Sequence, residues 1–173
     1  MATRDWLAVT EAGALRFFFE RLKDVIPADS TPRSELLYNA SVLAHYATTS
    51  TRSDAMFPPS PSSLATVFDL YVLDCSQHAD PSIMEAAASQ CLLLTGFFGA
   101  QLRGRHNLSW YATLGAGFYN RAASLGDDPK RSRMMGVMAE RFDYWRAQQT
   151  RLAKELRDQP RLIQALKDAT DAS

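Results

Sequence analysis

The chain has 173 residues, of which 46% are hydrophobic and 22% are charged, and its 19 basic residues balance its 19 acidic ones. A domain of this size buries about 70% of its unfolded surface, so the length predicts one self-sufficient domain over residues 1–173. Zero net charge argues against general nucleic-acid binding. The sequence contains no run of about 18 apolar residues, so we expect no membrane span.

Two helices are expected in the first third of the chain. The first has apolar residues at a spacing of three and four and ends at Pro27. Its apolar face consists of Leu15, Phe18, Leu22, Val25 and Ile26. Thr31 followed by Pro32 predicts the start of the second helix. Its apolar stripe consists of Leu36, Ala40, Leu43 and Ala47.

Residues 48–62 are rich in Ser, Thr and Pro, which predicts an irregular connector. Loops of this length are uncommon, so a functional lid is the alternative interpretation. A third helix is expected from Ser63 to His78.

Three further helices carry clear end signals. Asp80 followed by Pro81 predicts the start of the fourth, which we expect to stop at Gly104. Asn107 is the expected cap of the fifth helix, which ends at Gly126.

A sixth helix is expected from Pro129, capped by Asp128, to about Asp158, with residues 159–173 as a tail. Its apolar side consists of Met134, Met138, Phe142, Trp145, Gln149, Leu152 and Leu156. These signals together predict an all-α fold, a bundle of about six helices without a sheet.

Four glycines, Gly96, Gly99, Gly115 and Gly117, interrupt the fourth and fifth helices, although each costs a helix about 1 kcal/mol relative to alanine. Small residues let two helices approach closely, so we expect these helices to form a tight central hairpin. Its close-packing residues would be Gly96, Gly99, Gly115 and Ala116, with Phe97, Phe98, Trp110, Tyr111 and Phe118 pointing into the bundle. The alternative is a ligand pocket, lined by aromatic rings, between the two helices.

The predicted turn between these helices contains Arg103, Arg105, His106 and Asn107. Basic side chains stabilise the C-terminus of a helix, which is a sufficient structural reason for them. The alternative is a site for phosphate or carboxylate at the following helix N-terminus. Its ligand-binding residues would be Arg103, Arg105, His106, Asn107, Phe97, Trp110 and Tyr111.

A catalytic or metal-binding cluster has one candidate, formed by Asp74, Cys75 and His78. Asp74 and His78 lie four residues apart on one helix face, so they could act as an acid–base pair or as metal ligands with Glu85. The chain has no Glu-x-x-His sequence, and an ordinary helix end explains the same residues. We therefore expect no catalytic residue, no metal and no cofactor.

The segment around the glycines resembles a family of short all-helical bacterial proteins with no assigned activity. The resemblance covers residues 36–123 and is carried mainly by the run Leu94 to Phe98, by Trp110 and Tyr111, and by Gly115 and Tyr119. Members carry an acidic residue where this chain has Ser89-Gln90-Cys91, and Pro-Glu where it has Gly99-Ala100. The resemblance implies an all-α fold and transfers no catalytic residue.

Cysteine use and charge distribution lead to the expected function. Cys75 and Cys91 form no C-x-x-C pair, and the N-terminus lacks a signal layout, so we expect a cytoplasmic protein. Residues 1–102 carry a net charge of −5 and residues 103–173 carry +5. We expect a non-catalytic module that binds a protein partner or associates with itself as a homo-oligomer. A small-molecule or anion-binding module is the alternative, and an enzyme using Asp74, Cys75 and His78 is the third possibility.

Overall fold

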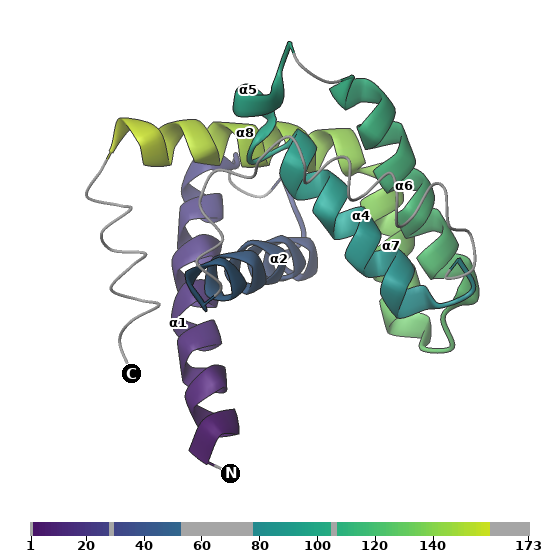
Figure 1. Cartoon of the computed structure of the whole chain (residues 1–173), viewed down its shortest axis with the longest axis horizontal. Helices are drawn as coiled ribbons and strands as arrows, with labels where there is room; N and C mark the ends of the chain where they lie inside the picture. The colour runs from purple at the N-terminus through teal and green to yellow at the C-terminus, as the bar shows by residue number, and fades with distance from the viewer. Residues whose placement is uncertain (1, 28–29, 53–77, 105–106, 160–173) are drawn as a thin grey trace. The chain divides into compact units, whose positions relative to one another are not determined.

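The computed structural model describes residues 2–27, 30–52, 78–104 and 107–159. These residues form an all-α fold in which no sheet is present, as the sequence predicts (Figure 1). They belong to two compact units, one of Met1–Phe57 with Arg151–Ser173 and the other of Pro58–Thr150. The expected third helix lies outside the described residues up to its last position, His78, and so do most of the connector and the tail.

The first unit contains the helices α1 (Ala2–Val25) and α2 (Arg33–Arg52), which pack against each other. The expected stripe of α2 is buried in full, whereas the expected face of α1 is buried only in part. Phe18, Leu22 and Ile26 are buried, and Leu15 and Val25 are half-buried. The stripe is Leu36, Ala40, Leu43 and Ala47. Helix α2 continues to Arg52, so residues 48–52 are helical where we expected the connector to begin.

The second unit is built around α4 (Pro81–Thr95), α6 (Leu108–Leu125) and α7 (Pro129–Glu140). Helices α4 and α6 lie side by side and run in opposite directions, and α7 packs against α6 (Figure 1). The central hairpin that we expected is therefore present.

The predicted caps begin and end these helices. The Asp80 side chain accepts a hydrogen bond from the Ser82 backbone N–H at 2.9 Å, and the Asp128 side chain accepts one from Lys130 at 3.0 Å. Gly126 is the C-cap of α6. Gly104 has a φ of +87°, a left-handed conformation that favours glycine and stops the chain from continuing as a helix.

Two of the helices that we expected to be continuous are broken. The predicted fourth helix ends at Thr95, and after a turn the chain forms only the short α5 (Gly99–Leu102). The predicted sixth helix is divided at Arg141 into α7 and α8 (Phe142–Asp158). Backbone hydrogen bonds continue on both sides of Arg141, from its N–H to the Val137 carbonyl and from the Trp145 N–H to its own carbonyl, so no loop separates α7 from α8.

Helix α8 belongs to both units, because the boundary between them falls between Thr150 and Arg151. In the part of the chain that the structure describes, no helix combines the length and the apolar character that a membrane crossing requires.

Candidate functional site

The residues of the predicted anion site are used for local structure where the structure describes them. The Asn107 Oδ1 atom accepts a hydrogen bond from the Trp110 N–H at 3.1 Å, so this side chain caps α6. Arg103 is exposed, and its backbone N–H closes α5 by donating to the Gly99 carbonyl at 2.9 Å. Arg105 and His106 lie outside the described residues.

The aromatic residues of that site form two ring pairs, each between neighbours in the sequence. The Phe97 and Phe98 rings meet edge to face with their centroids 4.9 Å apart, and the Trp110 and Tyr111 rings do the same at 4.9 Å. Phe98 is buried, whereas the Trp110 side chain is 42% exposed. The expectation that all five aromatic residues point into the bundle is therefore wrong for Trp110.

Two of the four glycines are closely packed against neighbouring helices, so no ligand could be accommodated beside them. A Cβ atom added at Gly115 would lie 2.7 Å from the Cβ of Cys91 on α4 and 2.6 Å from the ring of Phe142. A Cβ atom at Gly96 would lie 2.8 Å from the Leu92 carbonyl and 3.2 Å from the Arg146 carbonyl. Gly96 thus packs against the backbone of α8, whereas Gly115 packs against the Cys91 side chain of α4.

The other two glycines have different surroundings. The nearest atom to a Cβ at Gly99 would be Leu108 Cδ1 at an ordinary 3.9 Å, and Ala116 is half-buried. A Cβ at Gly117 would have no atom within 4 Å, because Gly117 is exposed. Packing thus fills the space at Gly115 that the alternative of a pocket between α4 and α6 requires, and open space lies instead beside Gly117.

Of the candidate catalytic cluster, the structure describes only His78, because Asp74 and Cys75 lie outside the described residues. The His78 carbonyl accepts a hydrogen bond from Arg121 Nε at 2.5 Å, and its ring meets the Phe118 ring at 5.9 Å. Burial raises the pKa of the Cys91 thiol to about 12, so that thiol stays protonated and is not activated as a nucleophile. Within the described ranges, no three His, Cys, Asp or Glu side chains gather as metal ligands would.

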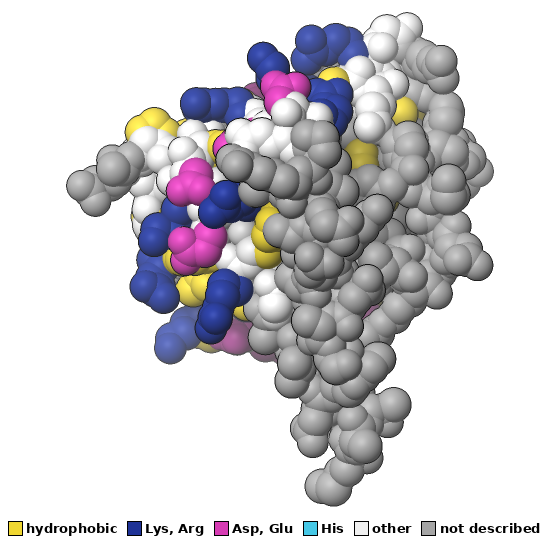
Figure 2. Space-filling view, turned by 90° about the vertical axis from the view of Figure 1, so that its left-hand side faces the viewer, with side chains coloured by type: hydrophobic (Ala, Val, Ile, Leu, Met, Phe, Trp, Pro, Cys, Tyr) yellow, Lys and Arg dark blue, Asp and Glu magenta, His cyan; other side chains and the backbone are white. Residues whose placement is uncertain are grey.

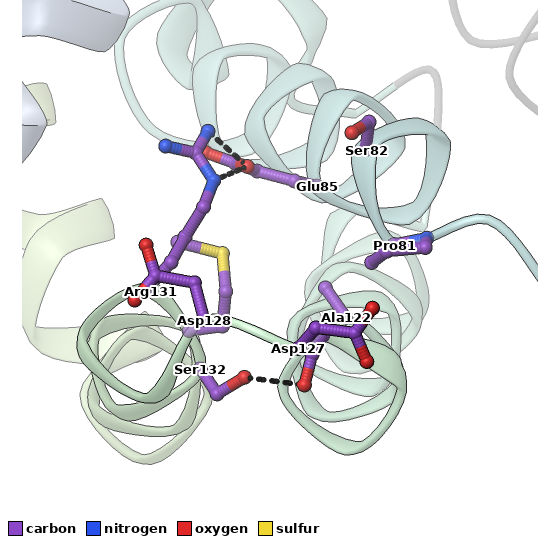
Figure 3. Close-up of a pocket in the computed structure, with 10 residues that line it drawn as sticks. Pro81, Ser82, Glu85, Ala122, Asp127, Asp128, Arg131 and Ser132 are labelled. Atoms are coloured by element: carbon purple, nitrogen blue, oxygen red, sulfur yellow. Dashed lines mark hydrogen bonds and ion pairs between the residues drawn. The ribbon is translucent and has the colours of Figure 1, made fainter.

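A small pocket of about 110 Å³ lies where α4 and α7 begin and α6 ends (Figure 3). Arg131 reaches across from α7 to Glu85 on α4, with Nε 2.9 Å from the carboxylate. The Ser132 hydroxyl donates to the Gly126 carbonyl at 3.2 Å. These contacts join three helix ends, and they leave space for little more than a few water molecules.

A larger groove of about 370 Å³ runs along the outer face of α6. Its lining on α6 follows a single helix face with the spacing of three and four residues. The described lining residues are His78, Trp110, Thr113, Leu114, Gly117, Phe118 and Arg121. The exposed Trp110 lies at one end of this α6 groove, and the open space beside Gly117 lies near its middle.

The α6 groove has one charged side chain among its described lining residues, Arg121, at the end opposite Trp110. Sequence reasoning missed the groove because it placed Trp110 in the core and assigned Gly117 no surroundings of its own. The signal that could have found it is the second apolar row on α6, Trp110, Leu114 and Gly117, beside the core row that contains Gly115 and Tyr119.

Comparison of the chain with family models, with curated proteins and with solved structures found no match in any of the three.

Proposed function

We propose that this chain is a non-catalytic module that binds a protein partner, with the α6 groove as its docking surface. The observation that carries the proposal is the exposed Trp110 beside an open apolar groove. Tryptophan dominates the energetics of many protein interfaces, because a large ring is buried when the partner docks. A Trp that is 42% exposed next to Leu114 and Gly117 supports such a use.

The spacing along the α6 groove fits a helical partner. Amphipathic helices dock in apolar grooves through side chains that recur every three or four residues. Gly117 lies in the middle of the groove, and the absence of atoms within 4 Å of its Cβ position leaves room for a partner side chain. The glycine also lets a partner helix approach more closely than a larger residue would.

The proposal is tested by filling the groove at Gly117. Gly117→Leu adds a side chain in open space on a helix, so it should favour the helix by up to about 1 kcal/mol while it obstructs docking. Gly136→Leu is the matched control, because Gly136 on α7 has equally open surroundings and does not line the groove.

The probe is a yeast-displayed library of three-turn helical peptides, selected against the full-length protein. We expect the selected peptides to bind the wild type and Gly136→Leu equally and to bind Gly117→Leu at least about tenfold more weakly. Equal binding to both variants, or no selected binder at all, would overturn the proposal. Circular dichroism of both variants confirms that they remain folded.

A further inference from the structure

We infer, on the basis of the proposed function, that the helix docking in the α6 groove carries a carboxylate that pairs with Arg121. Arg121 is exposed, and it forms no ion pair with the residues that the structure describes. The described lining contains no Asp or Glu that could neutralise it. Among the residues that the structure describes, the groove therefore offers an apolar surface with a positive charge at one end that none of their carboxylates neutralises.

The position of this charge is defined by the fold. Arg121 Nε donates to the His78 carbonyl at 2.5 Å, which uses one of the five N–H groups of the guanidinium. The remaining N–H groups can donate to a carboxylate with the planar geometry that favours arginine over lysine. Because the guanidinium is already oriented, less side-chain entropy is lost when a partner binds.

The dimensions of the groove favour a protein segment over a small carboxylate. Trp110 and Arg121 lie on one helix, about 16 Å apart along its axis at 1.5 Å per residue. A single small acid could meet Arg121 but not the apolar end. A partner helix of about three turns, with apolar residues towards Trp110 and Gly117 and Asp or Glu at the opposite end, meets both features.

A second copy of the chain fits the groove less well. Leu37 on α2 is, besides Trp110, the large apolar residue that stands out as exposed among the described side chains. Its neighbours on the same helix face are Arg33, Ser34 and Ser41, and the nearby Glu35 is buried. That face therefore brings no accessible carboxylate towards Arg121.

The test is a charge reversal on the peptides selected for groove binding. Arg121→Glu should weaken their binding at least about tenfold, and changing the peptide's acidic residue to Lys should restore binding to that variant. Arg133→Glu is the control, because Arg133 is an exposed base on α7 that does not line the groove. The restored binding also shows that Arg121→Glu is folded.

Each outcome separates this inference from the proposed function. If Gly117→Leu abolishes binding but Arg121→Glu does not, or if the selected peptides lack an acidic residue, the charge pairing is overturned and the docking surface stands. If Gly117→Leu has no effect, the docking surface itself fails. A dimer detected by light scattering that Gly117→Leu dissociates would assign the groove to a second copy and overturn the acidic partner.

Discussion

The surroundings of each glycine decide what a side chain at that position would do. At Gly115 a methyl group would overlap Cys91 and Phe142, whereas at Gly117 and Gly136 it would enter open space. The neighbours of Gly115 include a backbone-proximal Cβ atom that cannot move without shifting α4. Glycine is therefore required at one of these three helical positions and only tolerated at the other two.

Gly115→Ala should destabilise the protein by about 1–3 kcal/mol, because overpacking outweighs the gain in helix propensity of about 1 kcal/mol. Gly117→Ala and Gly136→Ala should instead stabilise it by about 0.5–1 kcal/mol. Urea unfolding of the three variants measures these differences. A stable Gly115→Ala variant would show that α4 and α6 are farther apart than described.

The buried thiol of Cys91 links stability to alkaline pH. Well below the unfolded pKa of about 8.5, the thiol is protonated in the folded and in the unfolded chain, so it leaves stability unchanged. Above this pKa the thiol of the unfolded chain ionises, while the folded pKa is about 12, so the free energy of unfolding falls by about 1.4 kcal/mol per pH unit. The free energy of unfolding should therefore decrease progressively between the unfolded pKa of about 8.5 and the folded pKa of about 12.

Cys91→Ala should remove this part of the pH dependence. We expect the urea midpoint of the wild type to fall more steeply than that of Cys91→Ala between pH 9 and 11. In this range the folded thiol, with its pKa of about 12, stays protonated while the unfolded thiol is ionised. Burial and the negative charge of the Cys91 thiolate both raise the pKa of Tyr111, so the difference between the two curves reports the thiol together with this coupling. Parallel curves would contradict the burial of Cys91.

At the scale of helices, end signals and breaks differ in how well the sequence predicts them. Asp80, Asn107 and Asp128 were predicted as caps because an acceptor side chain before a helix has a local function, independent of the rest of the fold. The break at Arg141 could not be predicted, because neither Pro nor Gly marks it and the apolar spacing continues from Met138 to Phe142 and Trp145.

The break after Thr95 has a cause that lies outside its own segment. Gly96 accepts the close approach of α8, where the Thr150 hydroxyl donates to the Gly96 carbonyl at 2.9 Å and Arg146 Nε donates to the Thr95 carbonyl at 3.4 Å. These residues are about 50 positions away in the sequence, so local reasoning places Gly96 inside a helix. The groove could not be predicted for the same reason. Whether Trp110 is exposed depends on which face of α6 the other helices cover, and local sequence does not show this.

Asn107→Ala should destabilise the protein by about 1 kcal/mol, because it leaves the Trp110 N–H without its cap. Asn107→Asp keeps the acceptor and should be close to neutral. Chemical denaturation of both variants, followed by circular dichroism, compares them. If Asn107→Asp lost as much stability as Asn107→Ala, the side-chain acceptor would not be the cause.

At the scale of the whole molecule, the charge split along the sequence disappears in the folded units. Residues 1–57 with 151–173 hold 11 basic and 11 acidic residues, and residues 58–150 hold 8 of each. Figure 2 shows Asp and Glu side chains among the Lys and Arg side chains of one face. The −5 and +5 halves therefore give no basis for head-to-tail self-association, because neither folded unit has a net charge.

The mass of the protein in solution should accordingly not depend on salt. We expect size-exclusion chromatography with light scattering to give the same mass at low and high ionic strength, where the Debye length falls from about 30 Å to about 3 Å. A mass that decreases as salt is added would restore electrostatic self-association as an explanation.

The position of the unit boundary inside α8 has a consequence for synthesis. A ribosome delivers the chain from its N-terminus, so every residue of the unit Pro58–Thr150 is made before Arg151 exists. The unit that starts with α1 still lacks the last two turns of α8 at that moment. The unit whose synthesis begins first is therefore the unit that is completed last, and all residues of the proposed docking groove are synthesised in between.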